Sequence, residues 1–289
     1  MPSISAKEFL LWEKKQLSKG GDKSSFYFLL QAIGGISSDD INFVRVDTQR
    51  HLYFEKSLKY IESIWDNHIN QSNPIQYLCG LAFWRDLKLK VSEKVLIPRP
   101  ETELIVDIVL NLFGKNSKRI FFAELGTGSG AISIALALAK PFWEGVATDI
   151  DKYALDVASE NFIHYSNKSN LRFICGNWLN PLKSYKGEID LIISNPPYIP
   201  KNIYQKLPKE VKNFEPKIAL LGGEDGLEHI REIILCAPNF LKDNGWLIIE
   251  NHFDQGAKVR QLFLENSFTS VEVLKDLSGI GRFTIGRYK

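Results

Sequence analysis

The chain has 289 residues, of which 44% are hydrophobic and 24% charged, so it can bury a sizeable core and does not have the composition of a disordered protein. A formal net charge of +2 attracts polyanions only weakly, which disfavours a protein that binds nucleic acid directly. The first residues do not resemble a secretion signal and no later stretch reaches about 18 consecutive apolar residues, so we expect a soluble, cytoplasmic protein without a membrane segment.

Residues 1–75 have the pattern of a helical domain. Ser5 and Glu8 have the spacing of a capping box, and apolar residues follow at helical intervals. A second helix is expected over Ser24–Leu30, and a longer one over Gln49–Ile69, whose apolar residues lie on or near one stripe. No strand pattern is seen before residue 80. The sequence therefore predicts a small helical domain at residues 1–75.

Residues 76–98 are interpreted as a linker that contains a β-hairpin. Leu87–Val91 alternates apolar residues with lysines, Ser92–Lys94 can turn the chain, and Val95–Ile97 can form the second strand. Two prolines end this strand. A helix is then expected over Thr102–Phe113, with its first residue as the cap.

Residues 99–289 alternate strands with helices. Apolar strands separated by helices such as Ser129–Lys140 and Tyr153–Tyr165 favour an α/β fold with a mostly parallel, seven-stranded sheet. The last two strands follow one another closely, which suggests an antiparallel hairpin. Pro200–Pro216, rich in Lys and Asn, is expected to be a mobile loop. The expected strands are Arg119–Leu125, Gly145–Asp149, Leu171–Cys175, Asp190–Ser194, Trp246–Asn251, Ser270–Leu274 and Arg282–Arg287.

A glycine-rich turn follows the first of these strands. Gly126, Gly128 and Gly130 lie between a strand and a helix, where glycine lets the backbone turn sharply and approach a ligand closely. Their GxGxG spacing is one residue shorter than the GxGxxG of dinucleotide-binding folds, which disfavours NAD and suits a ligand without a pyrophosphate. Taken alone, the cluster is also compatible with a structural turn.

Two further residues follow the ends of neighbouring strands. Asp149 can accept hydrogen bonds from the hydroxyls of a ribose, or it can cap the next helix, a role that Asp151 fills equally well. Trp178 can lie beside an adenine ring or serve as a core aromatic. Together with the glycine turn, these residues predict a nucleoside pocket at the carboxyl ends of the strands, for which S-adenosylmethionine is the best fit.

The tetrapeptide Asn195-Pro196-Pro197-Tyr198 follows the fourth strand and is expected to face the same pocket. The side-chain oxygen of Asn195 and the carbonyl of Pro196 are acceptors, and Tyr198 offers a flat face. Such a set can hold both N–H bonds of a planar NH2 group and direct its nitrogen at a sulfonium methyl, with no evident general base. A proline turn that merely closes a strand is the alternative.

Several motifs resemble known families. ELGTGSG, TDID and ISNPPYIP resemble class I S-adenosylmethionine-dependent methyltransferases that act on planar nitrogen. More narrowly, FWRDLKLKVSEKVLIPRPETELIVD, NFEPKIALLGGEDGLEHIREII and the helical N-terminal segment resemble the release factor glutamine methyltransferases of the HemK/PrmC type, over nearly the whole chain. The resemblance implies a Rossmann-like fold and methylation of the side-chain amide nitrogen of the glutamine in the GGQ motif of class 1 peptide chain release factors, with S-adenosylhomocysteine as the second product.

The resemblance also implies residue roles. The glycine loop would hold the methionine part of the cofactor, Asp149 its ribose and Trp178 its adenine. Asn195-Pro196-Pro197-Tyr198 would hold the glutamine amide, and residues 1–75 would help to dock the release factor. The residues expected to bind the cofactor are Gly126, Thr127, Gly128, Ser129, Gly130, Asp149, Trp178 and Asn195.

Other functions remain open at this stage. A related enzyme could methylate a glutamine of a ribosomal protein, and the NPPY motif also serves enzymes that methylate the amino group of a nucleic-acid base. The near-neutral charge disfavours the second of these. A non-catalytic binding protein that kept the fold is disfavoured by the intact glycine loop, Asp149 and Asn195.

Some residues depart from the family pattern or have no assigned role. Asn177, Leu221, His252 and Ile280 differ from the residues usual in relatives, which affects the expected adenine contact and local packing. The three cysteines are too few and too scattered for a disulfide framework or a zinc cluster. Two of them, Cys175 and Cys236, are expected to pack in the core. The histidines expected at the surface or an interface, with no chemical role, are His51, His68, His164 and His229.

Overall fold

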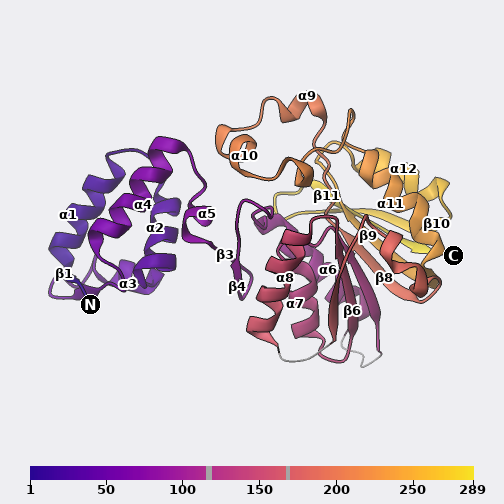
Figure 1. The fold of residues 1–289 in the computed structure, drawn as a ribbon, viewed down its shortest axis with the longest axis horizontal. Coiled ribbons are helices and arrows are strands. Elements are labelled where there is room, and N and C mark those ends of the chain that lie inside the picture. Colours follow the sequence, from indigo (N-terminus) through magenta and orange to yellow (C-terminus); the bar gives the residue numbers. More distant parts are fainter. Residues whose placement is uncertain (115–118, 167–169) are drawn as a thin grey trace. The chain divides into compact units, whose positions relative to one another are not determined.

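The chain folds into two compact units in the computed structural model (Figure 1). The structure describes residues 1–114, 119–166 and 170–289. The first unit comprises residues 1–81 and Lys209–Phe214, and the second comprises Ala82–Pro208 and Glu215–Lys289. Among the described residues, buried apolar side chains form one cluster in the first unit and two in the second.

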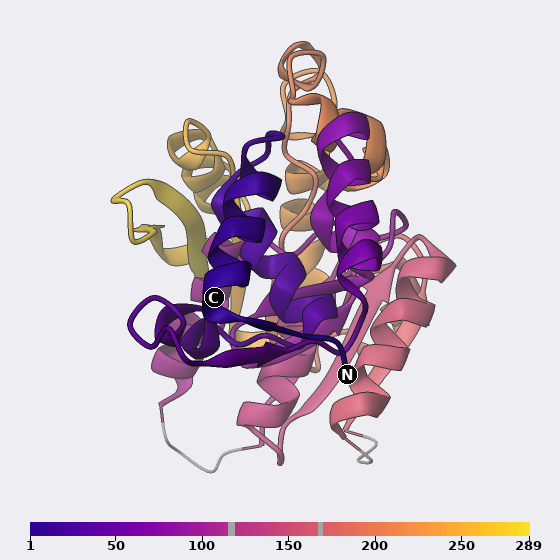
Figure 2. The same ribbon diagram turned by 90° about the vertical axis from the view of Figure 1, so that its left-hand side faces the viewer.

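The first unit is mainly helical (Figure 2). The predicted capping box is present, since the Oγ of Ser5 accepts from the N–H of Glu8 at 3.4 Å and the Glu8 carboxylate accepts from the N–H of Ser5 at 2.8 Å. Aromatic side chains fill the core, with the Phe26 and Trp65 rings 5.0 Å apart. In chain order the elements are β1 (Ser3–Ser5), α1 (Ala6–Leu17), α2 (Lys23–Leu29), the π-helical turn η1 (Leu30–Gly34), α3 (Ser38–Phe43), β2 (His51–Tyr53), α4 (Leu58–Gln71), α5 (Ile75–Cys79) and α10 (Lys209–Phe214).

Two predictions for this unit are wrong. The helix expected over Gln49–Ile69 begins only at Leu58, because Ser57 caps it by accepting from the N–H of Tyr60 at 3.3 Å. The residues before this cap include β2, which pairs antiparallel with β1, so the unit is not free of strands. In β2 only the middle residue, Leu52, is buried. This alternation of exposed and buried side chains has the period of two that is typical of a strand, and the prediction of a helix missed it.

The β-hairpin is also displaced from its predicted place. The structure pairs β3 (Leu81–Trp84) with β4 (Leu87–Lys90), and Arg85 turns the chain with a positive φ of 49°. Val95–Ile97, expected as the second strand, is not a strand. The β4 backbone instead bonds to a helix, since the Asn161 side chain both accepts from the Lys90 N–H at 2.7 Å and donates to its carbonyl at 3.0 Å.

The second unit contains the predicted seven-stranded sheet, within the described part of the chain, in the order β10-β11-β9-β8-β5-β6-β7. All neighbouring strands are parallel except β11, which is antiparallel to both of its neighbours. The strands are β5 (Phe121–Leu125), β6 (Glu144–Asp149), β7 (Leu171–Cys175), β8 (Ile189–Ser194), β9 (Leu241–Glu250), β10 (Phe268–Lys275) and β11 (Gly281–Tyr288). The helices are η2 (Pro100–Thr102), α6 (Glu103–Phe113), α7 (Ala131–Ala139), α8 (Lys152–Tyr165), η3 (Asn180–Tyr185), α9 (Lys201–Tyr204), η4 (Lys217–Ala219), α11 (Glu228–Cys236), η5 (Ala237–Asn239) and α12 (Gly256–Glu265).

Apolar side chains cover both faces of this sheet, as expected for parallel strands between helices. In β8, Leu191 and Ile193 pack in the cluster that contains α6 and α7, whereas Ile192 packs in the cluster that contains α11 and α12. Chain order reverses between β5 and β8, the arrangement whose carboxyl edge binds ligands in open α/β sheets. The fold thus brings the glycine turn after β5 next to the tetrapeptide after β8.

The segment Pro200–Pro216, predicted as a loop, contains two short helices, α9 and α10. Its mobility stays a prediction. No helix in the described residues is long and apolar enough to cross a membrane.

Candidate active site

A cavity at the carboxyl ends of β5, β6, β7 and β8 brings together six of the predicted residues. These residues, which all line it, are Gly126, Gly128, Asp149, Trp178, Asn195 and Pro197. They lie at the ends of four different strands or in the turns that follow them, so only the folded sheet places them side by side. Apolar side chains and other groups complete the wall, among them Leu96, Ile150, Ile218 and His229.

A second, adjoining hollow shares Leu96, Gly126, Gly128 and Asn195 with the first. Arg99, Thr102, Glu124, Thr127 and Ser129 lie in its lining. Of the remaining predicted site residues, Gly130, Pro196 and Tyr198 line neither hollow. Asn195 therefore lies where the two hollows meet.

The three glycines of the loop differ in how much space surrounds the position that a Cβ atom would occupy. All have positive φ, which glycine adopts readily. A Cβ on Gly128 would meet nothing within 4 Å, so its backbone is open to the cavity. A Cβ on Gly130 would lie 2.9 Å from Ile134 and 3.1 Å from Ala158, so this glycine permits close packing of α7 and α8. Gly126 lies between these cases, with Trp178 3.1 Å from its would-be Cβ.

A buried carboxylate inside the strand, Glu124, holds this loop in shape. It accepts from the Thr127 hydroxyl at 2.6 Å and from the N–H of Ser133 at 3.0 Å. Burial raises the pKa of Glu124 to about 7, and the charge of Asp149 adds to this effect. The sequence prediction overlooked Glu124, although an acid within the apolar strand FFAEL is a signal that could have revealed it.

Asp149 ties the glycine loop to the end of β6. One of its oxygens accepts from the N–H of Gly128 at 2.9 Å and the other from the N–H of Asp151 at 3.0 Å. Asp151, and not Asp149, caps α8 by accepting from the N–H of Tyr153 at 2.8 Å. Burial raises the pKa of Asp149. The predicted alternative of a helix cap therefore belongs to Asp151, and the Asp149 carboxylate faces the cavity.

Trp178 forms an aromatic wall of the first cavity. Its backbone has a positive φ of 46°, and its carbonyl accepts from the Thr148 hydroxyl at 2.9 Å. The ring centroid lies 5.5 Å from that of His229, whose buried Nδ1 has no hydrogen-bond partner within the described residues. Asn177 beside it donates to Glu232 at 2.9 Å. His229, predicted to have no role, thus lines the cavity next to Trp178.

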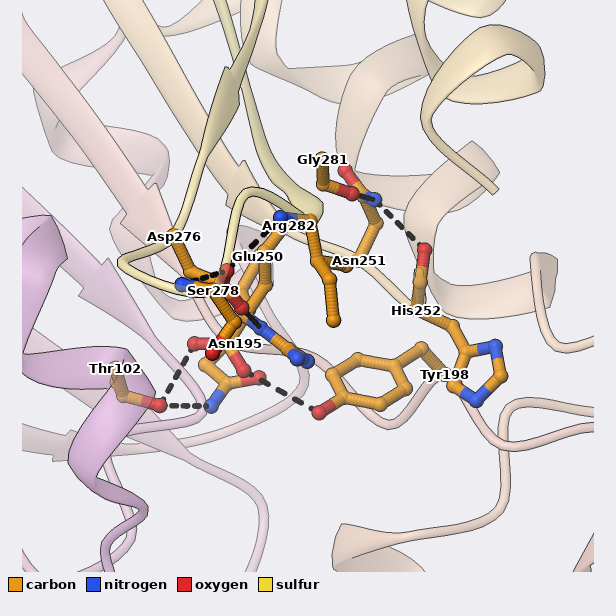
Figure 3. Close-up of polar contacts among 11 residues, drawn as sticks. Thr102, Asn195, Tyr198, Glu250, Asn251, His252, Asp276, Ser278, Gly281 and Arg282 are labelled. Atoms are coloured by element: carbon orange, nitrogen blue, oxygen red, sulfur yellow. Dashed lines mark hydrogen bonds and ion pairs between the residues drawn. The ribbon is translucent and has the colours of Figure 1, made fainter. Parts of the chain in front are cut away.

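The Asn-Pro-Pro-Tyr segment is held by side chains distant in sequence (Figure 3). The Nδ2 of Asn195 donates to the Oγ1 of Thr102 at 3.1 Å, and Thr102 donates to the Oε2 of Glu250 at 2.7 Å. The Tyr198 hydroxyl donates to the other oxygen of Glu250 at 3.3 Å. Thr102 makes no helix-capping hydrogen bond, contrary to prediction. Burial raises the pKa of Glu250 to about 7 and, aided by the Glu250 charge, raises that of Tyr198.

The backbone of this segment is packed against a second glycine-rich stretch. Gln255 donates to the carbonyls of Tyr198 and Gly226, each at 3.1 Å. A Cβ on Gly226 would lie 2.3 Å from the Tyr198 carbonyl oxygen, and one on Gly222 would lie 2.7 Å from that of Pro197. The GGEDG stretch therefore requires glycine because the NPPY backbone lies directly against it.

The structure also places the residues that depart from the family pattern. Leu221 forms a bridge with Ile199, and the N–H of Ile280 donates to Asp276 at 3.0 Å. His252 pairs with Asp254 at 2.7 Å, and its ring lies 6.1 Å from that of Tyr198. None of these contacts involves the glycine loop.

Two smaller predictions need correction. Cys175 is exposed and is not a core residue, whereas Cys236 is partly buried and packs against a core cluster, as predicted. His68 is buried and its Nδ1 lies 2.7 Å from the Asn73 carbonyl oxygen. Within the described residues, no group of acidic, His or Cys side chains could hold a metal ion.

The first cavity fits the nucleoside part of S-adenosylmethionine. Asp149 offers a carboxylate that can accept from two ribose hydroxyls, and Trp178 offers a flat apolar surface for a base. The open backbone at Gly128 leaves room for a chain that leads from the ribose toward the second hollow. The chemistry and placement of these groups are therefore those that this cofactor needs.

Comparisons with known proteins agree with this geometry. A model of the methyltransferase small domain matches residues 103–209. The release factor glutamine methyltransferase of Prochlorococcus marinus is 38% identical over 97% of this chain and 96% of its own length. The enzyme of the same name from Thermosynechococcus vestitus is 39% identical over 89% of this chain and 88% of its own length.

A solved methyltransferase from Pyrococcus furiosus shares the fold, with a TM-score of 0.50, 22% identity and coverage of 70% of this chain and 89% of its own. This likeness concerns the α/β fold alone. The family follows from the sequence relatives, which match nearly from end to end at well above 30% identity. The chain belongs to the release factor glutamine methyltransferase family.

Proposed function

We propose that this protein transfers the methyl group of S-adenosylmethionine to the side-chain amide nitrogen of the glutamine in the GGQ motif of class 1 peptide chain release factors. The observation that carries the proposal is the place of Asn195, between the two hollows and anchored through its Nδ2. Its Oδ1 receives no hydrogen bond from the described residues and so remains available to a substrate N–H.

The cofactor would be held by residues of both hollows. Asp149 would accept from the ribose hydroxyls, and Trp178 would lie against the adenine. The loop Gly126–Gly130 would hold the methionine part, with the open backbone of Gly128 toward the ligand and with Thr127 and Ser129 in the lining of the second hollow. When bound, S-adenosylmethionine supplies a methyl group on a positively charged sulfur.

The enzyme must position a weak nucleophile, because the lone pair of a carboxamide nitrogen is delocalised. The Oδ1 of Asn195 and the carbonyl of Pro196 would accept the two N–H bonds of the glutamine side chain, which fixes the direction of the nitrogen. The Tyr198 ring would lie beside the flat amide, and Pro196 and Pro197 stiffen the turn. The same two oxygens stabilise the positive charge that develops on the nitrogen, until one proton is lost.

Release factor is the proposed protein substrate, and the helical unit is proposed to help dock it. If this is correct, the full-length enzyme should have a much lower KM for an intact release factor than for a short GGQ peptide. Equal KM values for the GGQ peptide and the intact release factor would rule out a docking role outside the active site.

Mass spectrometry gives a direct test of the proposed reaction. Purified release factor is incubated with enzyme and S-adenosylmethionine, and the GGQ peptide is expected to gain the mass of one methyl group. An Asn195→Ala enzyme is the matched control. Transfer to a ribosomal protein or to nucleic acid, with none to release factor, would overturn the proposal in favour of those substrates.

A further inference from the structure

We propose that Thr102 and Glu250 are positioning residues that determine which atom of the Asn195 carboxamide faces the substrate. The inference rests on the proposed function, because it assigns Asn195 as the acceptor for the reacting amide. It concerns the IPRPETE motif, whose threonine had no place in the residue roles considered so far. Neither residue is proposed to touch the reacting atoms.

The three side chains form a continuous chain of hydrogen bonds (Figure 3). Asn195 donates to Thr102 at 3.1 Å, and Thr102 donates to Glu250 at 2.7 Å. Thr102 is 5% exposed and Glu250 is 1% exposed, so water does not compete effectively for these contacts. They join a turn after β8, the helical turn η2 and the end of β9, and are 93 and 148 residues apart in sequence.

The direction of each hydrogen bond follows from its neighbour. Both oxygens of Glu250 act as acceptors, Oε1 toward the Tyr198 hydroxyl and Oε2 toward the single hydroxyl hydrogen of Thr102. Thr102 then presents only lone pairs to Asn195, and only the NH2 end of the carboxamide can bond to it. The Oδ1 atom is consequently turned away from Thr102 and toward the substrate.

An asparagine without this anchor could turn its side-chain amide over, because the oxygen and the NH2 group have nearly the same shape. The turned amide would present N–H bonds to the N–H bonds of the substrate, which repels the substrate amide where attraction is needed. The Thr102–Glu250 pair therefore removes an unproductive orientation of the Asn195 amide.

The same carboxylate holds the other end of the segment. The Oε1 of Glu250 accepts from the Tyr198 hydroxyl at 3.3 Å, while its Oε2 is used by Thr102. One buried group at the end of β9 thus orients both the amide and the ring that flank the two prolines. Nearby, Arg282 is held by Asp276 at 2.9 Å and its positive charge favours the ionised form of Glu250.

Threonine variants test the inference through turnover. Thr102→Val keeps the shape and removes the hydroxyl, so we expect kcat at saturating cofactor to fall by roughly tenfold to a hundredfold. Thr102→Ser keeps the hydroxyl and should retain near-normal kcat. Equal losses in the two variants would show that the hydroxyl has no role.

The matched control is Thr284→Val. Thr284 is also fully buried and also bonds to an asparagine, since its hydroxyl donates to the Oδ1 of Asn251 at 2.8 Å. This pair lies outside both hollows. We expect Thr284→Val to lose stability without a comparable loss of kcat. A similar fall of kcat in Thr284→Val would show that the effect of Thr102→Val arises from general destabilisation, which would contradict the inference.

A second measurement does not depend on activity. In a protein labelled with ¹⁵N at asparagine, the side-chain NH2 signal missing in Asn195→Ala identifies Asn195. Its hydrogens should exchange slowly in the wild type and in Thr102→Ser, and much faster in Thr102→Val and Glu250→Ala. Unchanged exchange in these last two variants would overturn the inference. Slow exchange in a wild type that does not methylate release factor would instead overturn only the proposed function.

Discussion

Two buried glutamates divide the site into regions of different character. Glu124 and Glu250 are both buried in the sheet near the carboxyl ends of parallel strands, and burial raises the pKa of each to about 7. Glu124 bonds to residues three and nine positions later, and so shapes a local turn of backbone. Glu250 bonds to Thr102 and Tyr198, which are 148 and 52 residues away, and so orients side chains from separate elements.

This contrast separates two ways of building a binding surface. The region around Glu124 offers bare backbone to a ligand, and its shape depends on glycine. The region around Glu250 offers a side-chain oxygen, and its direction depends on a relay of hydrogen bonds. Substitutions in the first region should therefore change cofactor affinity or folding, and those in the second should change turnover.

The largest expected effect is that of Asn195→Ala. Loss of the acceptor for the substrate amide should lower kcat by about a hundredfold to a thousandfold, as for other groups that stabilise developing charge. The Kd for S-adenosylmethionine, measured by calorimetry, should stay within a few-fold of the wild type. A comparable loss of cofactor affinity would place Asn195 in the cofactor site and remove the distinction between the two regions.

Gly130→Ala should come next, with a loss of about 2–4 kcal/mol in the free energy of unfolding. The added Cβ meets both Ile134 and Ala158 in a backbone conformation with φ of 84°, so strain and overpacking add. Gly128→Ala shares the positive φ but meets nothing within 4 Å, and should cost less stability. Chemical denaturation of both variants gives the comparison, and equal losses would contradict it.

Asp149→Asn should weaken cofactor binding by roughly tenfold to a hundredfold, since hydrogen bonds to a charged acceptor contribute about 1.5–3 kcal/mol. Turnover at saturating cofactor should change much less. Steady-state kinetics with varied cofactor separates the two parameters. A fall in kcat with an unchanged cofactor KM would refute the assignment of Asp149 to the ribose.

The smallest effect is on the pH dependence of stability. The folded pKa of Glu124, about 7, is above its unfolded value of 4.5, so the folded state binds this proton more tightly. Stability should therefore fall as pH rises from about 5 to about 7, by on the order of 1–2 kcal/mol for this group. Unfolding of Glu124→Gln across that range should show a flatter profile, and a profile parallel to the wild type would contradict the assignment.

Much of the second unit could be predicted because its signals are local. Continuous apolar strands, intervening helices and the GxGxG turn lie within short windows. The seven strands predicted for the sheet all appear, Leu171–Cys175 with its predicted bounds and the others with shifted ends. The first unit was harder for the same physical reason. Its strands β1 and β2 are three residues each and pair across about 50 positions, so no window contains the partner that makes them strands.

The sequence alone determined the chemical identities at the site: the glycines, the strand-end acid Asp149, and the tetrapeptide that begins with Asn195. Only the tertiary structure decided what these groups are bonded to and which way they face. In the structure Asp151 caps the helix, and the carboxylate of Asp149 lines the cavity. The tertiary structure also joined Thr102 to Glu250, because a hydrogen bond requires proximity in space, and proximity between distant residues is created by packing of the whole sheet.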